Sequence, residues 1–158
     1  MKPSLKTMVI SLSISMNLYP TEEKEKLINL FNFFYPFESI AISEPDNYGI
    51  SKMSAEIIGK NSLSFLFTQV RKQRTVEAMR RFVLPKIDFN NQNCKFMIHK
   101  QALSRGLVIV CETKEESPLG PVYLEINANK IEEVIEYLFP PTEKGRVLEV
   151  DYSIEELD

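Results

Sequence analysis

The segment MVISLSISM, residues 8–16, alternates apolar side chains with smaller ones. Met8, Ile10, Leu12, Ile14 and Met16 recur at every second position, and three of the four residues between them are serines. A period of two is typical of a strand that buries one face and leaves the other near water. We therefore predict a β-strand near the start of the chain, against which the later elements pack.

The same segment superficially resembles a secretory signal, because Lys2 and Lys6 precede an uncharged run. A signal core would be evenly apolar and would end in small residues, whereas this run ends at Asn17-Leu18-Tyr19-Pro20. It is also shorter than the roughly 20 apolar residues that span a bilayer. We expect a cytoplasmic protein.

Three amphipathic helices are predicted downstream. The first covers residues 21–35, with Thr21 as the capping residue and Pro36 as the stop. The second is the longest, begins at Ser62 and ends before Pro85, and the third covers residues 131–138 before Pro140-Pro141.

Strand patterns lie between these helices. We predict strands at 38–42, 53–58, 94–98, 107–111, 122–126 and 146–152. The short connections between consecutive strands favour antiparallel pairing, since a parallel crossover needs a dozen or more residues. The expected fold is a single α+β domain over residues 1–158, with a mostly antiparallel mixed sheet covered by about three helices.

The composition is that of an ordinary globular domain. The chain has 158 residues, 44% of them hydrophobic and 26% charged, with a formal net charge of −3. These values exclude disordered, collagen-like and disulfide-framework chains. The net negative charge argues against a protein that coats nucleic acid over its whole surface, although a local basic patch remains compatible with it.

Two cysteines are too few for a disulfide framework, and their spacing matches no zinc motif. If residues 94–98 and 107–111 form a symmetrical hairpin, Phe96 lies opposite Ile109 and Cys94 opposite Cys111. The two thiols would then be neighbours, and in a reducing compartment we interpret them as buried free thiols.

No arrangement of residues indicates an enzyme. His99 is the one histidine in the sequence, and the paired glutamates are adjacent in sequence rather than facing each other. The five scattered glycines form no phosphate-binding loop. We therefore expect a non-catalytic protein with no metal and no small-molecule cofactor.

Positive charge is concentrated in one part of the chain. Residues 71–105 contain nine of the 19 Lys and Arg residues but only two of the 22 Asp and Glu residues, Glu77 and Asp88. This segment has a formal charge of +7, while the rest of the chain carries −10. Such a segment can attract phosphate groups while the remaining surface repels polyanions.

The periodicity of the long helix changes within this basic segment. An apolar arc that includes Leu66 and Val70 continues into Arg74, Glu77 and Arg81, and the later apolar residues move to the opposite face. We expect a kink or a change of packing partner near Gln73. The ionic arc is compatible with a partly buried ion network, which we favour, or with guanidinium groups directed at phosphate.

Four phrases resemble a known family when read in order. They are NLYPTEEKEKLINLFNFFYP, QVRKQRTVEAMRR, FMIHKQALSRG and SPLGP, at residues 17–36, 69–81, 96–106 and 117–121. Together they are similar to the archaeal uncharacterised protein family 0201. The most specific parts are Pro-Thr-Glu at residues 20–22, the Arg-x-Gln-Arg pattern at residues 71–74 and Lys-Gln-Ala at residues 100–102.

This resemblance implies a fold similar to that of large ribosomal subunit protein five, which carries 5S ribosomal RNA. It also implies a homodimer, and it supplies no activity. RNA binding is suggested for the family by analogy of fold, which is an associational argument.

Two functional hypotheses follow. The first is a non-enzymatic protein that contacts the phosphates and sugars of structured RNA. The second is a homodimeric protein-interaction module that binds no nucleic acid. The residues expected to contact RNA are Arg71, Lys72, Arg74, Arg80, Arg81, Lys100, Gln101 and Arg105.

Overall fold

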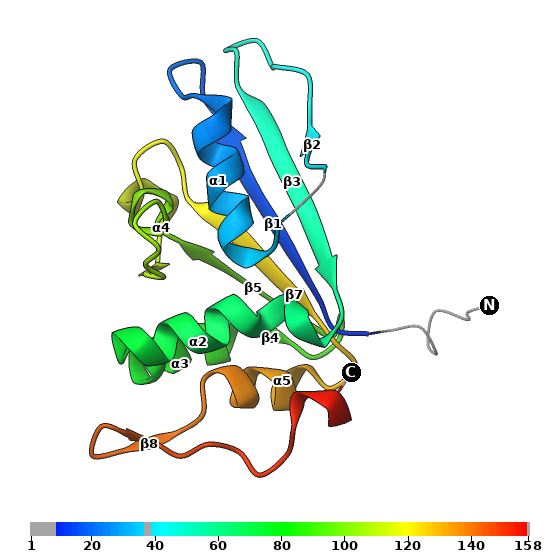
Figure 1. Cartoon of the computed structure of the whole chain (residues 1–158), viewed down its shortest axis with the longest axis vertical. Helices are drawn as coiled ribbons and strands as arrows, with labels where there is room; N and C mark the ends of the chain where they lie inside the picture. Colours follow the sequence, from blue (N-terminus) through cyan, green and yellow to red (C-terminus); the bar gives the residue numbers. More distant parts are fainter. Residues whose placement is uncertain (1–8, 37–38, 158) are drawn as a thin grey trace, which may run out of the picture.

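The computed structural model describes residues 9–36 and 39–157. Its main sheet has the strand order β2-β3-β1-β7-β5-β4, and β6 also pairs with β5. All pairs are antiparallel, so the fold is α+β with an antiparallel sheet (Figure 1). The strands are β1 (Ser11–Leu18), β2 (Ala41–Ile42), β3 (Ser51–Ile58), β4 (Ile87–Asp88), β5 (Asn93–Ile98), β6 (Val110–Cys111) and β7 (Val122–Asn127).

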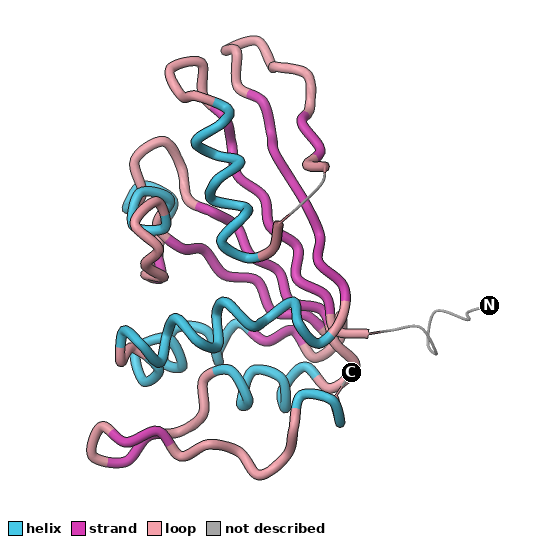
Figure 2. The backbone as a smooth tube through the Cα atoms, viewed as in Figure 1, coloured by secondary structure: helices cyan, strands magenta, loops and turns pink. Residues whose placement is uncertain are grey.

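Five α-helices occur in the described residues, two more than expected (Figure 2). One addition is the single turn α4, and the other arises because the long helix is divided. The helices are α1 (Lys24–Phe34), α2 (Ser64–Gln73), α3 (Val76–Val83), α4 (Lys100–Leu103) and α5 (Ile131–Leu138), and 3₁₀ turns cover Lys60–Leu63, Leu84–Lys86, Lys114–Glu116 and Ile154–Glu156. No helix in the described part of the chain is both long enough and apolar enough to span a membrane.

The alternation in the opening segment is confirmed. Ile10, Leu12, Ile14 and Met16 are each at most 1% exposed, and they join one core cluster to which β3, β5, β7 and all five helices contribute. Strand β1 pairs with β3 on one side and β7 on the other, which makes it central. Met8 lies outside the described residues.

The first helix starts later than predicted. It begins at Lys24 after the N-cap residue Glu23, and no side chain caps it, so the prediction for Thr21 is wrong. Leu27, Leu30 and Phe31 are buried as its period requires. Of the strand predicted at 38–42, Ala41–Ile42 is confirmed, and Glu38 lies outside the described residues.

The predicted break in the long helix is confirmed. Helix α2 ends at Gln73, and Arg74 adopts the left-handed conformation with φ of 60° and ψ of 41°. The Arg74 amide bonds to the carbonyl of Arg71 at 3.2 Å, and the Thr75 amide bonds to that of Val70 at 3.0 Å. These two bonds are those of a Schellman C-cap, in which glycine usually occupies the left-handed position.

The predicted hairpin register is wrong. Cys111 lies opposite Met97, whereas Cys94 lies opposite Ile87 on β4 and Ile126 on β7. The connection is no simple turn, because it contains α4 and buries Leu103 and Val108. Because these residues pack inward, the second strand of the hairpin, β6, begins later in the sequence than predicted. Both cysteines are nonetheless buried free thiols, as expected.

The last predicted strand, 146–152, is largely wrong. Only β9 (Arg146–Val147) is a strand, and it pairs with β8 (Thr142–Glu143) in a separate two-stranded sheet. Lys144 and Gly145 between them have φ of 52° and 80°, the two positive values of a tight primed hairpin turn. The chain therefore turns back on itself here and does not add an edge to the main sheet.

Candidate nucleic-acid interface

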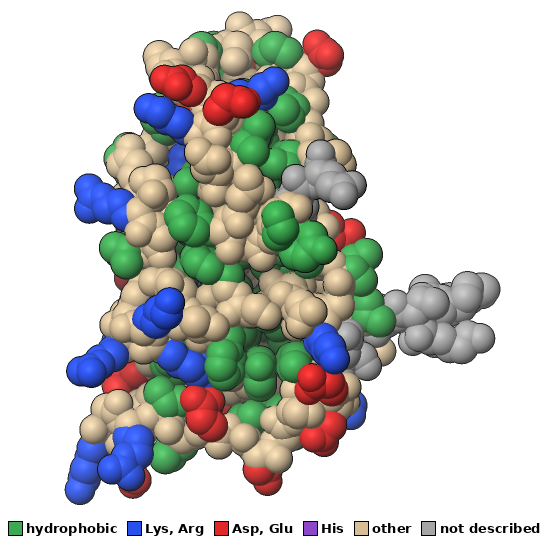
Figure 3. All heavy atoms as spheres, viewed as in Figure 1, with side chains coloured by type: hydrophobic (Ala, Val, Ile, Leu, Met, Phe, Trp, Pro, Cys, Tyr) green, Lys and Arg blue, Asp and Glu red, His purple; other side chains and the backbone are tan. Residues whose placement is uncertain are grey.

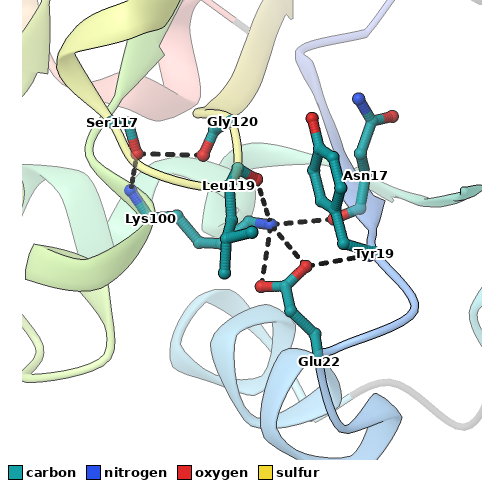
Figure 4. A network of polar contacts seen from close by, with 7 residues as sticks. All are labelled: Asn17, Tyr19, Glu22, Lys100, Ser117, Leu119 and Gly120. Atoms are coloured by element: carbon teal, nitrogen blue, oxygen red, sulfur yellow. Dashed lines mark hydrogen bonds and ion pairs between the residues drawn. The ribbon is translucent and has the colours of Figure 1, made fainter.

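The Lys100 side chain is buried at the start of α4 and is only 3% exposed. Its ammonium group donates to the carbonyl oxygens of Asn17 at 2.8 Å and Leu119 at 2.7 Å (Figure 4). Both carboxylate oxygens of Glu22 lie 3.1 Å from the same nitrogen. Burial lowers the pKa of Lys100, while the hydrogen bond and charge of Glu22 act in the opposite direction.

The surroundings of Lys100 bring together three of the phrases that carry the family resemblance. Glu22 also accepts a hydrogen bond from the Tyr19 amide at 3.0 Å. Ser117 accepts a hydrogen bond from the Lys100 amide at 3.0 Å and donates one to the carbonyl of Gly120 at 2.9 Å (Figure 4). These phrases therefore share a structural joint, which we call the Lys100 joint, and the ammonium is engaged within the protein.

Arg71 is likewise engaged within the protein. Its guanidinium makes two hydrogen bonds of 2.9 Å to the carboxylate of Glu149 and lies 3.5 Å above the centre of the Phe67 ring. It also donates to the carbonyl oxygens of Tyr137 and Leu138 at 3.2 and 3.0 Å. Arg71 thus holds α2, the end of α5 and the segment after β9 together.

Arg80 makes similar contacts from α3. It donates to both carboxylate oxygens of Glu136, at 2.8 and 3.1 Å, and to the carbonyl of Phe139 at 3.0 Å. Two-point contacts of this kind fix geometry as well as charge. Arg80 therefore connects α3 to α5, and its guanidinium is already hydrogen-bonded within the protein.

The remaining predicted residues are exposed. Lys72, Arg74, Gln101 and Arg105 have no side-chain hydrogen bond or ion pair among residues 9–36 and 39–157. Arg81 lies 3.6 Å from Glu77, and both side chains are nearly two-thirds exposed. An exposed pair of this kind is worth little, about 0.5 kcal/mol, so Arg81 can change partners easily.

The end of α2 and the loop after α4 are joined directly. The Gln73 side-chain amide donates to the carbonyl of Val108 at 2.8 Å and accepts from the Val108 amide at 2.7 Å. This two-way contact joins the end of α2, where Arg74 follows Gln73, to Val108, three residues after Arg105. The partly buried ion network that we favoured for Arg74, Glu77 and Arg81 is wrong: the helix break separates Arg74 from the other two, and Arg81 makes only an exposed pair with Glu77.

Lys and Arg side chains line one side of the molecule, on the left in Figure 3, at the levels of α4, of the α2–α3 junction and of the β8–β9 hairpin. We call the exposed residues of the predicted set, Lys72, Arg74, Arg81, Gln101 and Arg105, the cationic edge. Sequence reasoning missed two exposed cations of the hairpin, Lys144 and Arg146. The signal that could have found them is the phrase TEKGRV, in which a Lys-Gly turn separates two short polar arms.

A second group of polar side chains lies at the end of β5 that leads into α4. The ligand atoms of His99, Cys111 and Glu116 all lie within 4.8 Å of one another, although sequence spacing gave no such indication. Burial, with a contribution from the Glu116 charge, raises the pKa of the Cys111 thiol to about 11. These three residues are therefore the described group that could hold a metal ion, and the thiol is protonated at neutral pH.

Comparison with known proteins shows the family to which this chain is related. A family model described as RNA binding matches residues 11–128, which include every strand of the main sheet. Among individual proteins, a UPF0201 protein of Sulfolobus acidocaldarius is 32% identical over 127 residues, covering 80% of this chain and 84% of the relative. A UPF0201 protein of Metallosphaera sedula is 28% identical over 135 residues, covering 85% and 91%.

Solved structures share the fold. The crystal structure of a UPF0201 protein from Methanococcus jannaschii superposes with a TM-score of 0.73 at 21% identity, covering 87% of this chain and 98% of that one. A DUF54 protein from Methanothermobacter thermautotrophicus gives a TM-score of 0.60 at 19% identity, covering 82% and 94%. The chain belongs to the UPF0201 family.

Proposed function

We propose that this protein binds structured RNA, without catalysing a reaction, through the cationic edge. The observation that carries the proposal is that exposed cations follow both partners of one contact in the chain or precede them closely: Gln73 and Val108, which bond to each other, join the end of α2 to the segment after α4, and Arg74 and Arg105 on these two segments are exposed. The description of the matched family model as RNA binding supports the same function.

The contacts are expected to reach phosphate and sugar rather than base edges. The cations at the edge offer many donors, and planar guanidinium groups fit phosphate oxygens well. Recognition of folded RNA relies on backbone shape and needs few aromatic platforms. Arg71, Arg80 and Lys100, which are engaged within the protein, act as the scaffold that positions the edge.

The likeness to large ribosomal subunit protein five and the homodimer belong to this proposal. A dimer would present two cationic edges to one RNA, which raises affinity by linking two contacts. The competing hypothesis is that the edge binds an acidic protein partner or a second copy of the chain.

Salt dependence of RNA binding tests the proposal. The wild-type protein is titrated with a fluorescently labelled RNA stem–loop across a series of salt concentrations. We expect the logarithm of the association constant to fall linearly with the logarithm of salt concentration, by about 0.9 for each duplex phosphate contacted. The variant Arg74→Gln/Arg81→Gln should bind more weakly, with a slope smaller by about 2.

The matched control is Lys52→Gln/Lys130→Gln, which removes the same charge from exposed lysines on β3 and before α5. It should retain the wild-type slope. RNA binding that is insensitive to salt, or equal slopes for the two variants, would overturn the proposal. Absence of binding, combined with a melting temperature that rises with protein concentration, would favour the interaction module instead.

A further inference from the structure

The β8–β9 hairpin presents two cations at a rigid tip. Lys144 occupies the first turn position, and Arg146 follows Gly145 and lies opposite Glu143. Both cations are exposed, and no ion pair in the described residues includes either of them. The two-residue turn limits how far these side chains can move relative to each other.

Contacts on both arms fix this hairpin against the junction of α2 and α3. The Thr142 hydroxyl donates to a carboxylate oxygen of Glu77 at 3.0 Å. The Leu148 amide bonds to the carbonyl of Pro141 at 2.9 Å, and Glu149 receives the two hydrogen bonds from Arg71. The hairpin is therefore an ordered part of the surface.

A cleft of about 250 Å³ separates the hairpin from the junction. Arg74 lines it from the helix side, and Gly145 and Val147 line it from the hairpin side. Glu77 also lines it, but its carboxylate is engaged by Thr142 and lies near Arg81. Arg74 and the hairpin residues Gly145 and Val147 thus border the same depression, and the exposed Lys144 and Arg146 are next to these hairpin residues in the chain.

We propose that Lys144 and Arg146 form a second phosphate-binding element, which extends the cationic edge beyond Arg74. This inference rests on the proposed RNA binding and adds residues outside the matched segment, which ends at residue 128. An RNA backbone following the edge would meet the loop after α4, then the α2–α3 junction and then the hairpin. A hairpin that is already ordered adds contacts at low entropic cost.

The test compares Lys144→Gln/Arg146→Gln with wild type in the same stem–loop titration. Two lost phosphate contacts should reduce the salt slope by about 1.8 for a duplex or 1.4 for a single strand. The Lys52→Gln/Lys130→Gln variant again serves as the charge-matched control. Because the substituted side chains are exposed, the melting temperature of the hairpin variant should remain close to that of wild type.

The outcomes separate the two proposals. Wild-type binding with a steep salt slope that the hairpin variant fully retains overturns the hairpin inference alone. A reduced slope in the hairpin variant and a wild-type slope in the control support it. If wild type does not bind, or binds without salt dependence, both proposals are overturned.

To separate a local contact from a change in hairpin position, Thr142→Val removes the bond to Glu77 and keeps both cations. It should reduce RNA affinity less than Lys144→Gln/Arg146→Gln does. If Thr142→Val alone reproduces the full loss of slope, the cations are not the contacts and the inference fails.

Discussion

At the scale of single residues, Lys100 was predicted to contact RNA, but its buried ammonium has a structural role within the protein. Removing an ammonium from water is costly unless acceptors replace the water. Two carbonyl oxygens and the Glu22 carboxylate do so here, and the Tyr19 ring centre lies 5.6 Å away. Contacts within the protein therefore satisfy the charge and the hydrogen-bond donors of Lys100, without any contact to RNA.

Lys100→Met should lower the free energy of unfolding by about 3 kcal/mol, because it leaves the nearly buried Glu22 carboxylate without its counter-charge. Urea denaturation measures this change. The neighbouring exposed residue provides the control, and Gln101→Ala should stay within about 0.5 kcal/mol of wild type. Adding Glu22→Gln to Lys100→Met should recover part of the loss, and equal stability of Lys100→Met and wild type would contradict this account of the joint.

The two thiols predict a loss of stability at alkaline pH. Burial raises the pKa of Cys94 from 9.0 to about 12, and burial with the charge of Glu116 raises that of Cys111 to about 11. Above pH 9 the unfolded chain releases protons that the folded chain retains, so stability falls as pH rises toward these values. Each thiol contributes a slope of about 1.4 kcal/mol per pH unit in that window.

Denaturation at a series of pH values from 7 to 11, for wild type and Cys94→Ala/Cys111→Ala, measures the effect. The variant should be less stable near pH 7, because each substitution leaves a small cavity. The difference in the free energy of unfolding between wild type and this variant should become smaller above pH 9. A gap that is constant with pH would mean that the thiols ionise equally in both states.

At the scale of elements, the junction between α2 and α3 combines strain with exposed charge. Arg74 occupies the left-handed position of the C-cap, where a side chain costs about 1–2 kcal/mol relative to ordinary conformations. Strained residues often mark functional sites, because the surrounding structure must hold them in place. Here the strained residue is also a cation of the proposed interface.

Arg74→Gly should therefore raise the free energy of unfolding by about 1 kcal/mol and reduce the salt slope of RNA binding by about 1. Urea denaturation and the stem–loop titration measure the two effects. Lys72→Gly is the matched control in the last turn of α2, where glycine should cost about 1 kcal/mol. Destabilisation of equal size in both variants would show that Arg74 is not strained.

Local patterns predicted most elements, and long-range packing caused the errors. The alternation of β1, the apolar face of α5 and the break at Gln73 each depend on neighbours within a few residues. The register of β5 and β6 does not, because Leu103 and Val108 draw their connection onto the core. The final hairpin depends on a Lys-Gly turn whose first residue is an unusual choice at positive φ.

At the scale of the whole molecule, exposed cations recur along one side of the surface. The formal charge is −3, yet the cationic edge and the hairpin tip lie on one side (Figure 3). If the proposed RNA binding holds, positive potential on this side would orient the protein toward the polyanion. The sequence showed the excess of cations at residues 71–105, and the fold adds residues 144–146 to it.

The sequence could not reveal which cations have partners within the protein. Arg71 and Arg80 lie in the same basic helical segment as Arg74 and Arg81, and nothing in the sequence distinguishes the two pairs. The acceptors of Arg71 and Arg80 are Glu149 and Glu136, which are far away in sequence. Lys100 reaches back 78 residues to Glu22. Only the folded structure shows which cations are bonded within the protein and which are exposed.

The Lys100 joint has a consequence for local opening of the native state. Its acceptors come from Asn17 at the end of β1, Glu22 before α1 and Leu119 before β7, so detachment of any of these segments takes an acceptor away from the buried ammonium and weakens the joint as a whole. Amide hydrogens near residues 19 and 120 should consequently exchange with solvent at a common rate, as a single unit that opens more readily than the strand centres.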